Sequence, residues 1–277
     1  LGEGSTLKLP NIVATVISGG VFSTSGLEFE DYMYLLSEFN SFSDELEALV
    51  KLRKELGKTL RAKYGNLPED GGALSAPLSS SREAFDVMLE VAEQCGFGAH
   101  VTLGLDVAAS ELYQSQAALY RVSGHPDFTR DALADYYASL CKEYPLTLIE
   151  DGFDQDDWAG FKLLKQRVPD IQVVGDDLFV SNAERLKIGI QEDCANALLL
   201  KINQIGTVTE ALEAGRLASE NNYDIIVSLR SGETTDDFIA DLSVAVGARQ
   251  IKLGSPVRAE RNAKYNRLLK ISQELTE

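Results

Sequence analysis

Five charged residues each stand at the carboxyl end of a short apolar segment that is typical of a buried strand. Three are acidic, Asp106, Glu150 and Asp176, and two are basic, Lys201 and Lys252. Parallel strands of an α/β protein end at the same edge, so folding would bring these five charges together. Carboxylate oxygens from three strands suit Mg²⁺, and a lysine near a metal can act as a base. The pattern therefore predicts a metal-and-lysine active site.

Each of these residues also has a purely structural interpretation. An acidic residue after a strand often caps the next helix, and a strand-end lysine often extends its ammonium to solvent. One carboxylate by itself would favour the cap, whereas three at the ends of successive strands favour a metal site. We therefore predict Mg²⁺ ligands at Asp106, Glu150 and Asp176, a base at Lys201 and a second cation at Lys252.

A sixth segment, residues 227–234 (VSLRSGET), has the composition of an anion site. It leaves a strand pattern and contains Arg230 and Ser231 just before a predicted helix. A guanidinium, a hydroxyl and the free N–H groups of a helix start together suit a phosphate group. An arginine at a strand end is also common in ion pairs, so this segment alone is a weak indication.

The elements that must position these residues alternate regularly from residue 82 onward. Helical patterns cover 43–63, 82–95, 130–143, 157–167, 182–193, 207–221, 235–247 and 258–275, and strand patterns cover 11–17, 100–105, 146–150, 171–175, 196–201, 224–228 and 249–253. Ser43 or Asp44 is the expected cap of the first helix. Repeated βα units predict a parallel sheet with right-handed crossovers, and the number of strands favours a closed α/β barrel over an open sheet.

The predicted barrel also locates the active site. In such barrels the site lies at the carboxyl ends of the strands, where the five charges fall. The loop at 65–81, which is rich in glycine, proline and serine, is a candidate active-site loop. The glycine-rich motifs of dinucleotide-binding folds and of P-loop proteins are absent from the sequence, which argues against a nucleotide-binding sheet.

Composition limits the partners and the compartment. The 277 residues carry a net charge of −17, which argues against nucleic acid as a partner. No stretch approaches the roughly 18 apolar residues of a membrane span. Cys95, Cys141 and Cys194 have no metal-ligand spacing, which indicates a reducing compartment. The first ten residues do not form a signal peptide, so we expect a cytoplasmic protein.

Several long segments resemble the signature stretches of the enolase family, the glycolytic phosphopyruvate hydratases. These segments are LIEDGFDQDDW, VVGDDL, LLLKINQIGTVTEA, VSLRSGETTDDFIADL, QIKLGSP and RAERNAKYNRLLKI, with weaker similarity in GLDVAASELY and LPNIVATVISGG. The similarity covers almost the whole chain and matches the carboxyl-terminal barrel domain of that family. It implies a modified barrel in which an early hairpin-like strand breaks the strict βα alternation.

The resemblance also implies a reaction and a role for each matching residue. It implies Mg²⁺ on the three predicted carboxylates and Lys201 as the base that removes the C2 proton of 2-phosphoglycerate. Lys252 would bind the substrate carboxylate, and Arg230 with Ser231 would bind its phosphate. A lysine base with Mg²⁺ stabilising an ene-diolate is the known pattern of this superfamily.

The sequence departs from the family pattern at four positions of the site. Leu229 and Phe22 stand where the family has histidine, and Asp31 and Asp70 stand where it has glutamate. By the same resemblance Asp31 and Asp70 are expected to be catalytic, and Glu30 is expected to bind substrate. Shortening a proton donor by one methylene moves it by about an ångström, which can cost about 10²-fold in rate.

These departures leave three hypotheses open. The first is an enolase-like lyase that dehydrates 2-phosphoglycerate to phosphoenolpyruvate. The second is an enolase-like pseudoenzyme with a binding or structural role. The third is a superfamily enzyme in which Lys201 and Mg²⁺ remove the α-proton of another carboxylate.

The resemblance also predicts the domain organisation. Residues 1–277 would form one barrel domain, with residues 1–8 as the remnant of a linker to a smaller α+β domain that the family has and this sequence lacks. The expected ligand is a small phosphorylated carboxylate. Two assemblies stay open, a homo-oligomer and a complex with a separate chain that supplies the smaller domain.

Overall fold

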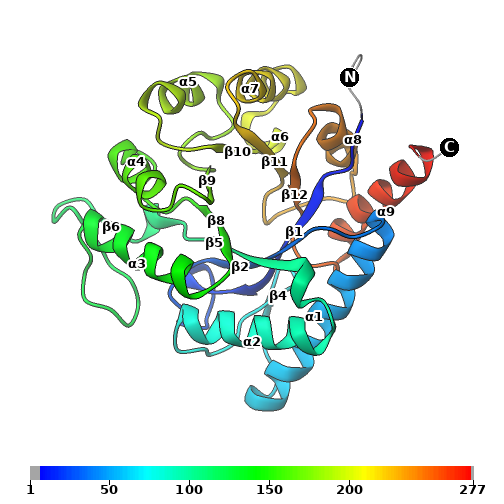
Figure 1. Ribbon diagram of the computed structural model, residues 1–277, viewed down its shortest axis with the longest axis horizontal. Helices are drawn as coiled ribbons and strands as arrows, with labels where there is room; N and C mark the ends of the chain where they lie inside the picture. Colours follow the sequence, from blue (N-terminus) through cyan, green and yellow to red (C-terminus); the bar gives the residue numbers. More distant parts are fainter. Residues whose placement is uncertain (1–6, 276–277) are drawn as a thin grey trace.

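Eight strands close into a barrel (Figure 1). The computed structural model describes residues 7–275, apart from the side chain of Phe22. The barrel strands are β1 (Asn11–Ser18), β2 (Asp31–Leu36), β5 (Val101–Asp106), β8 (Leu146–Glu150), β9 (Gln172–Gly175), β10 (Ala197–Leu200), β11 (Asp224–Ser228) and β12 (Gln250–Lys252). They are hydrogen-bonded in chain order, and β12 pairs with β1 to complete the ring.

One strand breaks the parallel arrangement. Strand β2 runs antiparallel to both of its neighbours, β1 and β5, whereas the other barrel pairs are parallel. The connection from β1 to β2 contains only the short 3-10 helix η1 (Gly20–Phe22), and a parallel pair would need a longer crossover. The predicted α/β barrel with an early hairpin-like strand is confirmed.

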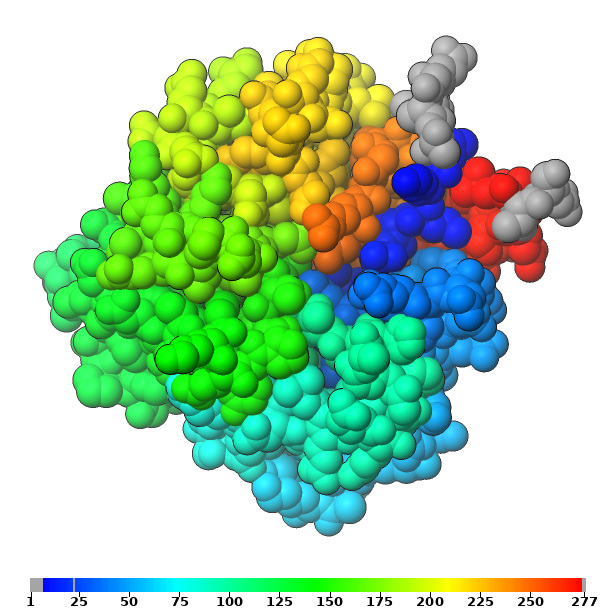
Figure 2. Space-filling model, viewed as in Figure 1, coloured from blue at the N-terminus to red at the C-terminus, as the bar shows by residue number. Residues whose placement is uncertain are grey.

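The helices form a ring outside the barrel (Figure 1). They are α1 (Phe42–Tyr64), α2 (Ser81–Gln94), α3 (Arg130–Glu143), α4 (Trp158–Arg167), α5 (Ala183–Glu192), α6 (Ile202–Ile205), α7 (Val208–Glu220), α8 (Phe238–Ala245) and α9 (Ala259–Glu274). The expected cap of α1 was wrong, because Ser41 accepts the hydrogen bond from the backbone N–H of Asp44. The first and last helices, α1 and α9, lie side by side and close the ring (Figure 2).

Two apolar clusters lie on opposite faces of the barrel wall. The smaller one fills the interior and consists of Val13, Met33, Leu35, Leu148, Val174, Ala197, Leu199 and Ile226. The larger one lies between the strands and the helices, and it includes Leu198 and Leu200 of β10. Alternate residues of a strand point to opposite faces, so a strand such as β10 contributes to both clusters.

Short elements attach to the barrel near its ends. The segment at 65–81 contains a hairpin of β3 (Glu69–Asp70) and β4 (Ala73–Leu74), and β4 pairs with the end of β1 through Leu74 and Ile17. A second hairpin is formed by β6 (Tyr113–Gln114) and β7 (Leu119–Tyr120). The 3-10 helices η2 (Gly98–His100) and η3 (Ala109–Glu111) flank β5. Among the described residues, no helix has the length and apolarity that crossing a membrane requires.

Candidate active site

A polar cavity of about 130 Å³ opens at the carboxyl ends of the parallel strands. Its lining includes nine of the residues that sequence analysis selected, namely Glu30, Asp31, Asp70, Asp106, Asp176, Lys201, Arg230, Ser231 and Lys252. The tenth, Glu150, is completely buried and reaches the same cluster through Lys252. The structure therefore brings all ten together, although Asp31 and Lys252 are more than 200 positions apart.

The two-residue period of the strands explains why these side chains face inward. Leu148 and Val174 belong to the barrel interior, and Glu150 and Asp176 follow each of them by two residues. In the same way, Lys201 follows the interior residue Leu199 by two positions. Residues two apart on an extended chain share a face, so the inward row of each strand continues into the cavity as a charge.

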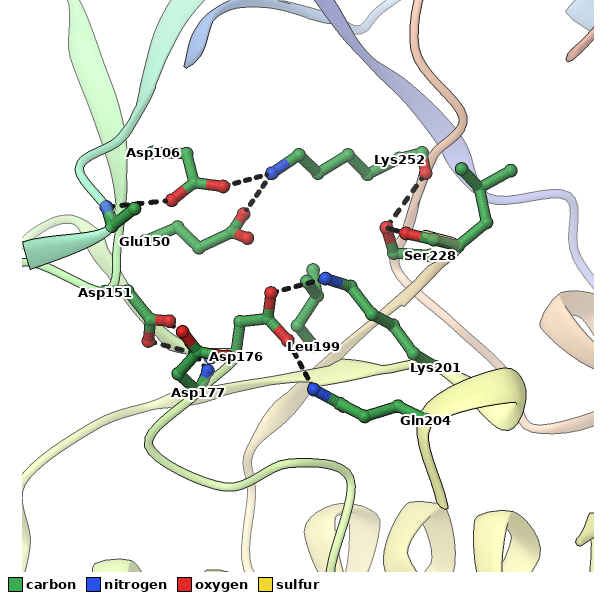
Figure 3. Close-up of polar contacts among 12 residues, drawn as sticks. Asp106, Glu150, Asp151, Asp176, Asp177, Leu199, Lys201, Gln204, Ser228 and Lys252 are labelled. Atoms are coloured by element: carbon green, nitrogen blue, oxygen red, sulfur yellow. Dashed lines mark hydrogen bonds and ion pairs between the residues drawn. The ribbon is translucent and has the colours of Figure 1, made fainter. Parts of the chain in front are cut away.

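Lys252 is surrounded by carboxylates. Its Nζ lies 2.7 Å from Asp106 Oδ2 and 2.8 Å from Glu150 Oε2 (Figure 3). It also lies 3.7 Å from Asp31 Oδ2. Burial alone would lower the pKa of Lys252, but Asp106 and Glu150 raise it well above its ordinary value. Burial raises and Lys252 lowers the pKa of Asp106, and the net pKa lies below the usual range. This ammonium and the Asp106 carboxylate are therefore both charged.

Lys201 enters the cavity from the end of β10, two strands away from β12. It forms an ion pair with Asp176, whose other oxygen accepts a hydrogen bond of 3.3 Å from Gln204 Nε2 (Figure 3). The backbone N–H of Lys201 donates to Ser181 Oγ at 2.8 Å, which fixes the end of β10. Burial and Lys252 lower the pKa of Lys201, but Asp176 and Glu150 raise it further. In this arrangement of charges the pKa of Lys201 therefore lies above its ordinary value.

A third aspartate, Asp151, braces the end of β9. Its two carboxylate oxygens accept hydrogen bonds from the backbone N–H groups of Asp176, at 2.9 Å, and of Asp177, at 2.7 Å (Figure 3). Each of these three aspartates offers an oxygen within 4.8 Å of the others, so together they could hold a metal ion. Of this group, sequence analysis selected only Asp176. The described residues thus contain an acidic group that could hold a metal ion, and its membership differs from the predicted set.

Burial changes the protonation of several acids near the cavity. It raises the pKa of Glu30 to about 9, with help from Asp106, and that of Asp31 to about 6. It also raises the pKa of Glu150 well above the ordinary value, and Asp106 adds to the shift. Glu30 is therefore protonated at neutral pH and can donate a hydrogen bond, which an ionised carboxylate cannot do.

None of the predicted metal ligands caps a helix. The cap of α4 is Asp157, and the cap of α5 is Asn182, which accepts from two backbone N–H groups. Asp106 Oδ1 accepts only a local bond of 3.3 Å from the N–H of Ala108, and η3 has no side-chain cap. The capping interpretation of these carboxylates is therefore wrong.

The predicted anion segment lies at the cavity but not at a helix start. Helix α8 begins at Phe238, well after Ser231, so its N–H groups do not join Arg230 as expected. The loop is held from below by Arg261 of α9, whose guanidinium donates to the carbonyl oxygens of Arg230, at 3.2 Å, and of Ser231, at 3.0 Å. The guanidinium of Arg230 and the hydroxyl of Ser231 belong to residues that line the cavity. The first turn of α8 is not among the described residues of the lining.

The hairpin that carries Asp70 is anchored by α1. Arg53 is 4% exposed, and its guanidinium donates two hydrogen bonds to the carbonyl of Gly72, at 2.9 and 2.7 Å. It also pairs with Glu69 at 3.1 Å. Gly72 has a φ of +97°, and an added Cβ would lie 2.5 Å from Val257 Cγ2, so only glycine fits this turn.

Comparison with known proteins agrees with this architecture. A family model described as the enolase carboxyl-terminal TIM barrel domain matches residues 6–277. An enolase of Methanopyrus kandleri is 45% identical over 282 residues, and one of Methanocaldococcus jannaschii is 44% identical over 279. The chain belongs to the enolase family.

The match covers the chain more completely than it covers its relatives. A Pyrococcus furiosus enolase is 42% identical over 282 residues, an alignment that includes 99% of this chain and 65% of the relative. For the Methanopyrus kandleri and Methanocaldococcus jannaschii enolases the covered share of the relative is 66% and 65%. The chain therefore spans about 65% of the length of the enolases that it matches.

Two of the expected departures from the family pattern, Leu229 and Phe22, replace a histidine. Leu229 lines the cavity and packs partly against the outer apolar cluster, so an isobutyl group stands where a histidine was expected. The prediction for Phe22 rests on a side chain that lies outside the described part of the structure, although its backbone belongs to η1.

Several residues that shape the cavity of the enolase barrel were not predicted from the sequence. Thr15 Oγ1 donates to Asp31 at 2.9 Å, and Asp151, Asp177 and Arg261 line the same space. Asp151 stands directly after Glu150, and Asp177 follows Asp176, so their place next to predicted ligands was the available signal. Arg261 had no such signal, because it lies on a helix far from any strand end.

Proposed function

We propose that this enolase barrel removes the C2 proton of 2-phosphoglycerate and expels the C3 hydroxyl to form phosphoenolpyruvate. The observation that supports the proposal is the meeting of Lys201, Lys252 and three strand-end carboxylates in one cavity with an arginine and a hydroxyl. This arrangement combines a base, a site for a carboxylate and a site for a phosphate within a small space.

The residues present fit a hard divalent cation such as Mg²⁺. Glu150 Oε1 is fully buried and accepts no hydrogen bond from any residue that the structure describes. A buried acceptor without a partner is costly, and coordination of a cation would satisfy it. We assign Mg²⁺ to Asp106, Glu150 and Asp176, with Asp151 as the brace that orients the β9 end. Bound Mg²⁺ would supply positive charge beside the substrate carboxylate.

Lys201 accepts the proton in this proposal as a neutral amine, after the ammonium that pairs with Asp176 has released its own proton to water. Its Nζ enters the cavity from β10, and the pair of electrons in the C2–H bond becomes the C2–C3 double bond as the C3 hydroxyl departs. The departing hydroxide takes a proton from an acid of the cavity. Asp70 and Asp31 are the expected catalytic acids, and Glu30, with a pKa of about 9, holds a proton at neutral pH for binding substrate oxygens.

The other cationic groups orient the substrate. Lys252 is charged and lies within 3 Å of two acids, so it can exchange one of these contacts for a substrate carboxylate. Arg230 and Ser231 line the cavity as the site for the phosphate. Lys252, Arg230 and Ser231 line the same cavity as Lys201, and together they would hold C2 of the substrate near the base.

A second function is favoured by the apolar side chain at Leu229. A hydrophobic residue in the cavity removes one donor that could stabilise developing charge, and such a loss can cost about 10²–10³-fold in rate. The same base could then act on another carboxylate whose α-proton is removed without loss of a hydroxyl. Proton exchange without dehydration would distinguish this function.

Two assays test the proposal. Ultraviolet absorbance measures phosphoenolpyruvate formation from 2-phosphoglycerate with and without Mg²⁺, and NMR in D₂O measures exchange of the C2 proton. We expect Mg²⁺-dependent formation of product. Bound Mg²⁺ with neither product nor exchange would contradict both functions and favour a non-catalytic role.

The cysteines agree with the proposed cytoplasmic location. Cys95, Cys141 and Cys194 are all free thiols, and Cys95 and Cys194 are buried. Free thiols are typical of reducing compartments, which is where a glycolytic reaction takes place.

A further inference from the structure

Residues 229–234, which we call the anion loop, rest on a buried cation of α9. Lys264 has no exposed surface, and its Nζ donates to the carbonyl oxygen of Thr234 at 2.6 Å. The same ammonium pairs with Glu233 Oε2 at 2.8 Å. A buried charge requires a partner, so Lys264 holds Glu233 in one position.

The second oxygen of Glu233 contacts α6. Glu233 Oε1 accepts a hydrogen bond of 2.7 Å from Asn203 Nδ2. Asn203 belongs to α6, which begins directly after Lys201. One carboxylate therefore joins the loop that contains Arg230 and Ser231 to the short helix that follows the proposed base.

The opposite side of α6 is already fixed to the barrel. Gln204 donates to Asp176 at 3.3 Å, and its side-chain oxygen accepts from Ser181 Oγ at 2.9 Å. Asn203 faces away from this anchor and is exposed. The bond to Glu233 is therefore the contact through which the anion loop can influence the orientation of α6.

We propose that Glu233 is a positioning residue that couples the anion loop to the segment carrying Lys201. When an anion binds Arg230 and Ser231, the ordered loop holds Asn203 through Glu233 and so fixes Lys201 relative to the substrate. This inference rests on the proposed anion and base roles. Glu233 itself contacts no substrate in this account, because both of its oxygens are occupied.

Removal of the Glu233 carboxylate and removal of the Asn203 amide should affect the stability of the fold differently. Loss of the carboxylate would leave Lys264 buried without its charged partner, which destabilises the fold. Loss of the exposed Asn203 amide leaves the buried pair intact. Asn203→Ala is therefore the informative variant. Asn221→Ala is its matched control, because Asn221 is also exposed and donates a single bond of 2.8 Å, to Leu217, on α7.

Hydrogen exchange followed by mass spectrometry tests the coupling without any need for activity. We expect amides 229–234 to exchange faster in Asn203→Ala than in the unaltered chain, although the substitution lies in another segment. Inorganic phosphate should slow exchange in both 229–234 and 201–206 of the unaltered chain, and only in 229–234 of Asn203→Ala. Asn221→Ala should behave like the unaltered chain.

Kinetics separate positioning from a general structural effect. We expect Asn203→Ala to lower kcat about 10-fold while KM for 2-phosphoglycerate changes less than twofold, because a small displacement of a base mainly affects the chemical step. Unchanged exchange in 229–234 would overturn the coupling even if the enzyme is active. Faster exchange in a chain that lacks dehydration activity would support the coupling and contradict the proposed function instead.

Discussion

Lys201 and Lys252 are both largely buried ammonium groups, but their surroundings differ. Lys252 lies among three carboxylates that come from β2, β5 and β8, whereas Lys201 pairs with the single acid Asp176. A group held by several opposite charges loses its proton at greater cost than a group held by one. At the residue scale this difference favours Lys201 as the base and Lys252 as a fixed positive charge.

Replacement of Lys201 by methionine tests the assignment. Methionine preserves much of the side-chain volume and removes the amine, so we expect C2-proton exchange to fall by about 10³-fold. NMR in D₂O measures the exchange, and Mg²⁺ titration confirms that the metal site persists. Lys187→Met is the matched control, since that lysine is exposed and pairs with Glu184 on α5. Exchange that survives in Lys201→Met would remove Lys201 from the mechanism.

Helix α1 is long enough to contact the barrel near both of its ends. Near its start, Glu45 accepts a hydrogen bond of 2.6 Å from the backbone N–H of Ile12 in β1. Eight residues later, or about 12 Å along the axis, Arg53 holds Gly72 of the active-site hairpin. At the scale of the element, one helix therefore connects the first strand to the loop that carries Asp70.

Glu45 gives the protein a pH-dependent stability. Burial raises the pKa of Glu45 to about 7 from an ordinary value of 4.5, so the folded state favours its protonated form. The contribution of Glu45 to the free energy of unfolding is complete below pH 4.5, decreases as the pH rises to about 7, and is lost above that. The free energy of unfolding that is lost over this range is about 3 kcal/mol.

Urea unfolding between pH 4 and 8 measures this effect. Glu45→Gln keeps an acceptor for Ile12 but cannot ionise, so its stability relative to the unaltered chain should increase across this pH range. Glu47→Gln alters an exposed acid of the same helix and should leave the pH profile unchanged. A difference between Glu45→Gln and the unaltered chain that does not vary with pH would contradict the account.

Arg53 is expected to control the hairpin. Arg53→Met leaves the Gly72 carbonyl without its two charged donors, which should destabilise the protein by about 2 kcal/mol and speed hydrogen exchange at 69–74. Arg61→Met removes a more exposed partner of the same Glu69 and should cost less than about 1 kcal/mol. Equal effects of the two substitutions would show that the bonds to Gly72 do not anchor the hairpin.

The whole molecule depends on the closure of the barrel and on the two apolar clusters that its wall separates. Each inward-facing row of apolar residues ends in a polar or charged group at the cavity, as Leu199 precedes Lys201 on β10. The packed barrel interior thus fixes the positions of the charged residues that follow it at the cavity. Loss of packing should lower global stability and also loosen the site.

Leu199→Ala measures this dependence. Leu199 has no exposed surface, so the substitution should cost about 3 kcal/mol and lower the melting temperature by about 5 °C. Val50→Ala, at a position that is 47% exposed on α1, should change stability by less than about 0.5 kcal/mol. Thermal unfolding by circular dichroism compares the two, and similar melting temperatures would contradict the interior packing.

Part of the site could be predicted from local sequence patterns alone. Strand-end charges such as Glu150 and Lys201 were predictable because a strand alternates its faces and a barrel gathers the carboxyl ends of its strands. Strand β2 gave no such alternation, since five of its six residues are buried. The enolase motifs supplied the antiparallel hairpin that the pattern could not.

The tertiary structure decided the contacts between distant segments. Three sets of contacts join different elements. They are the ion pairs of Lys252 with Asp106 and Glu150, the hydrogen bonds of Arg53 to Gly72, and the hydrogen bond of Asn203 to Glu233. No local period links such residues, because their proximity results from the closure of the barrel and from the packing of helices around it. The sequence of each strand thus determines which charged residues face the site. The closure of the barrel determines which partners they contact.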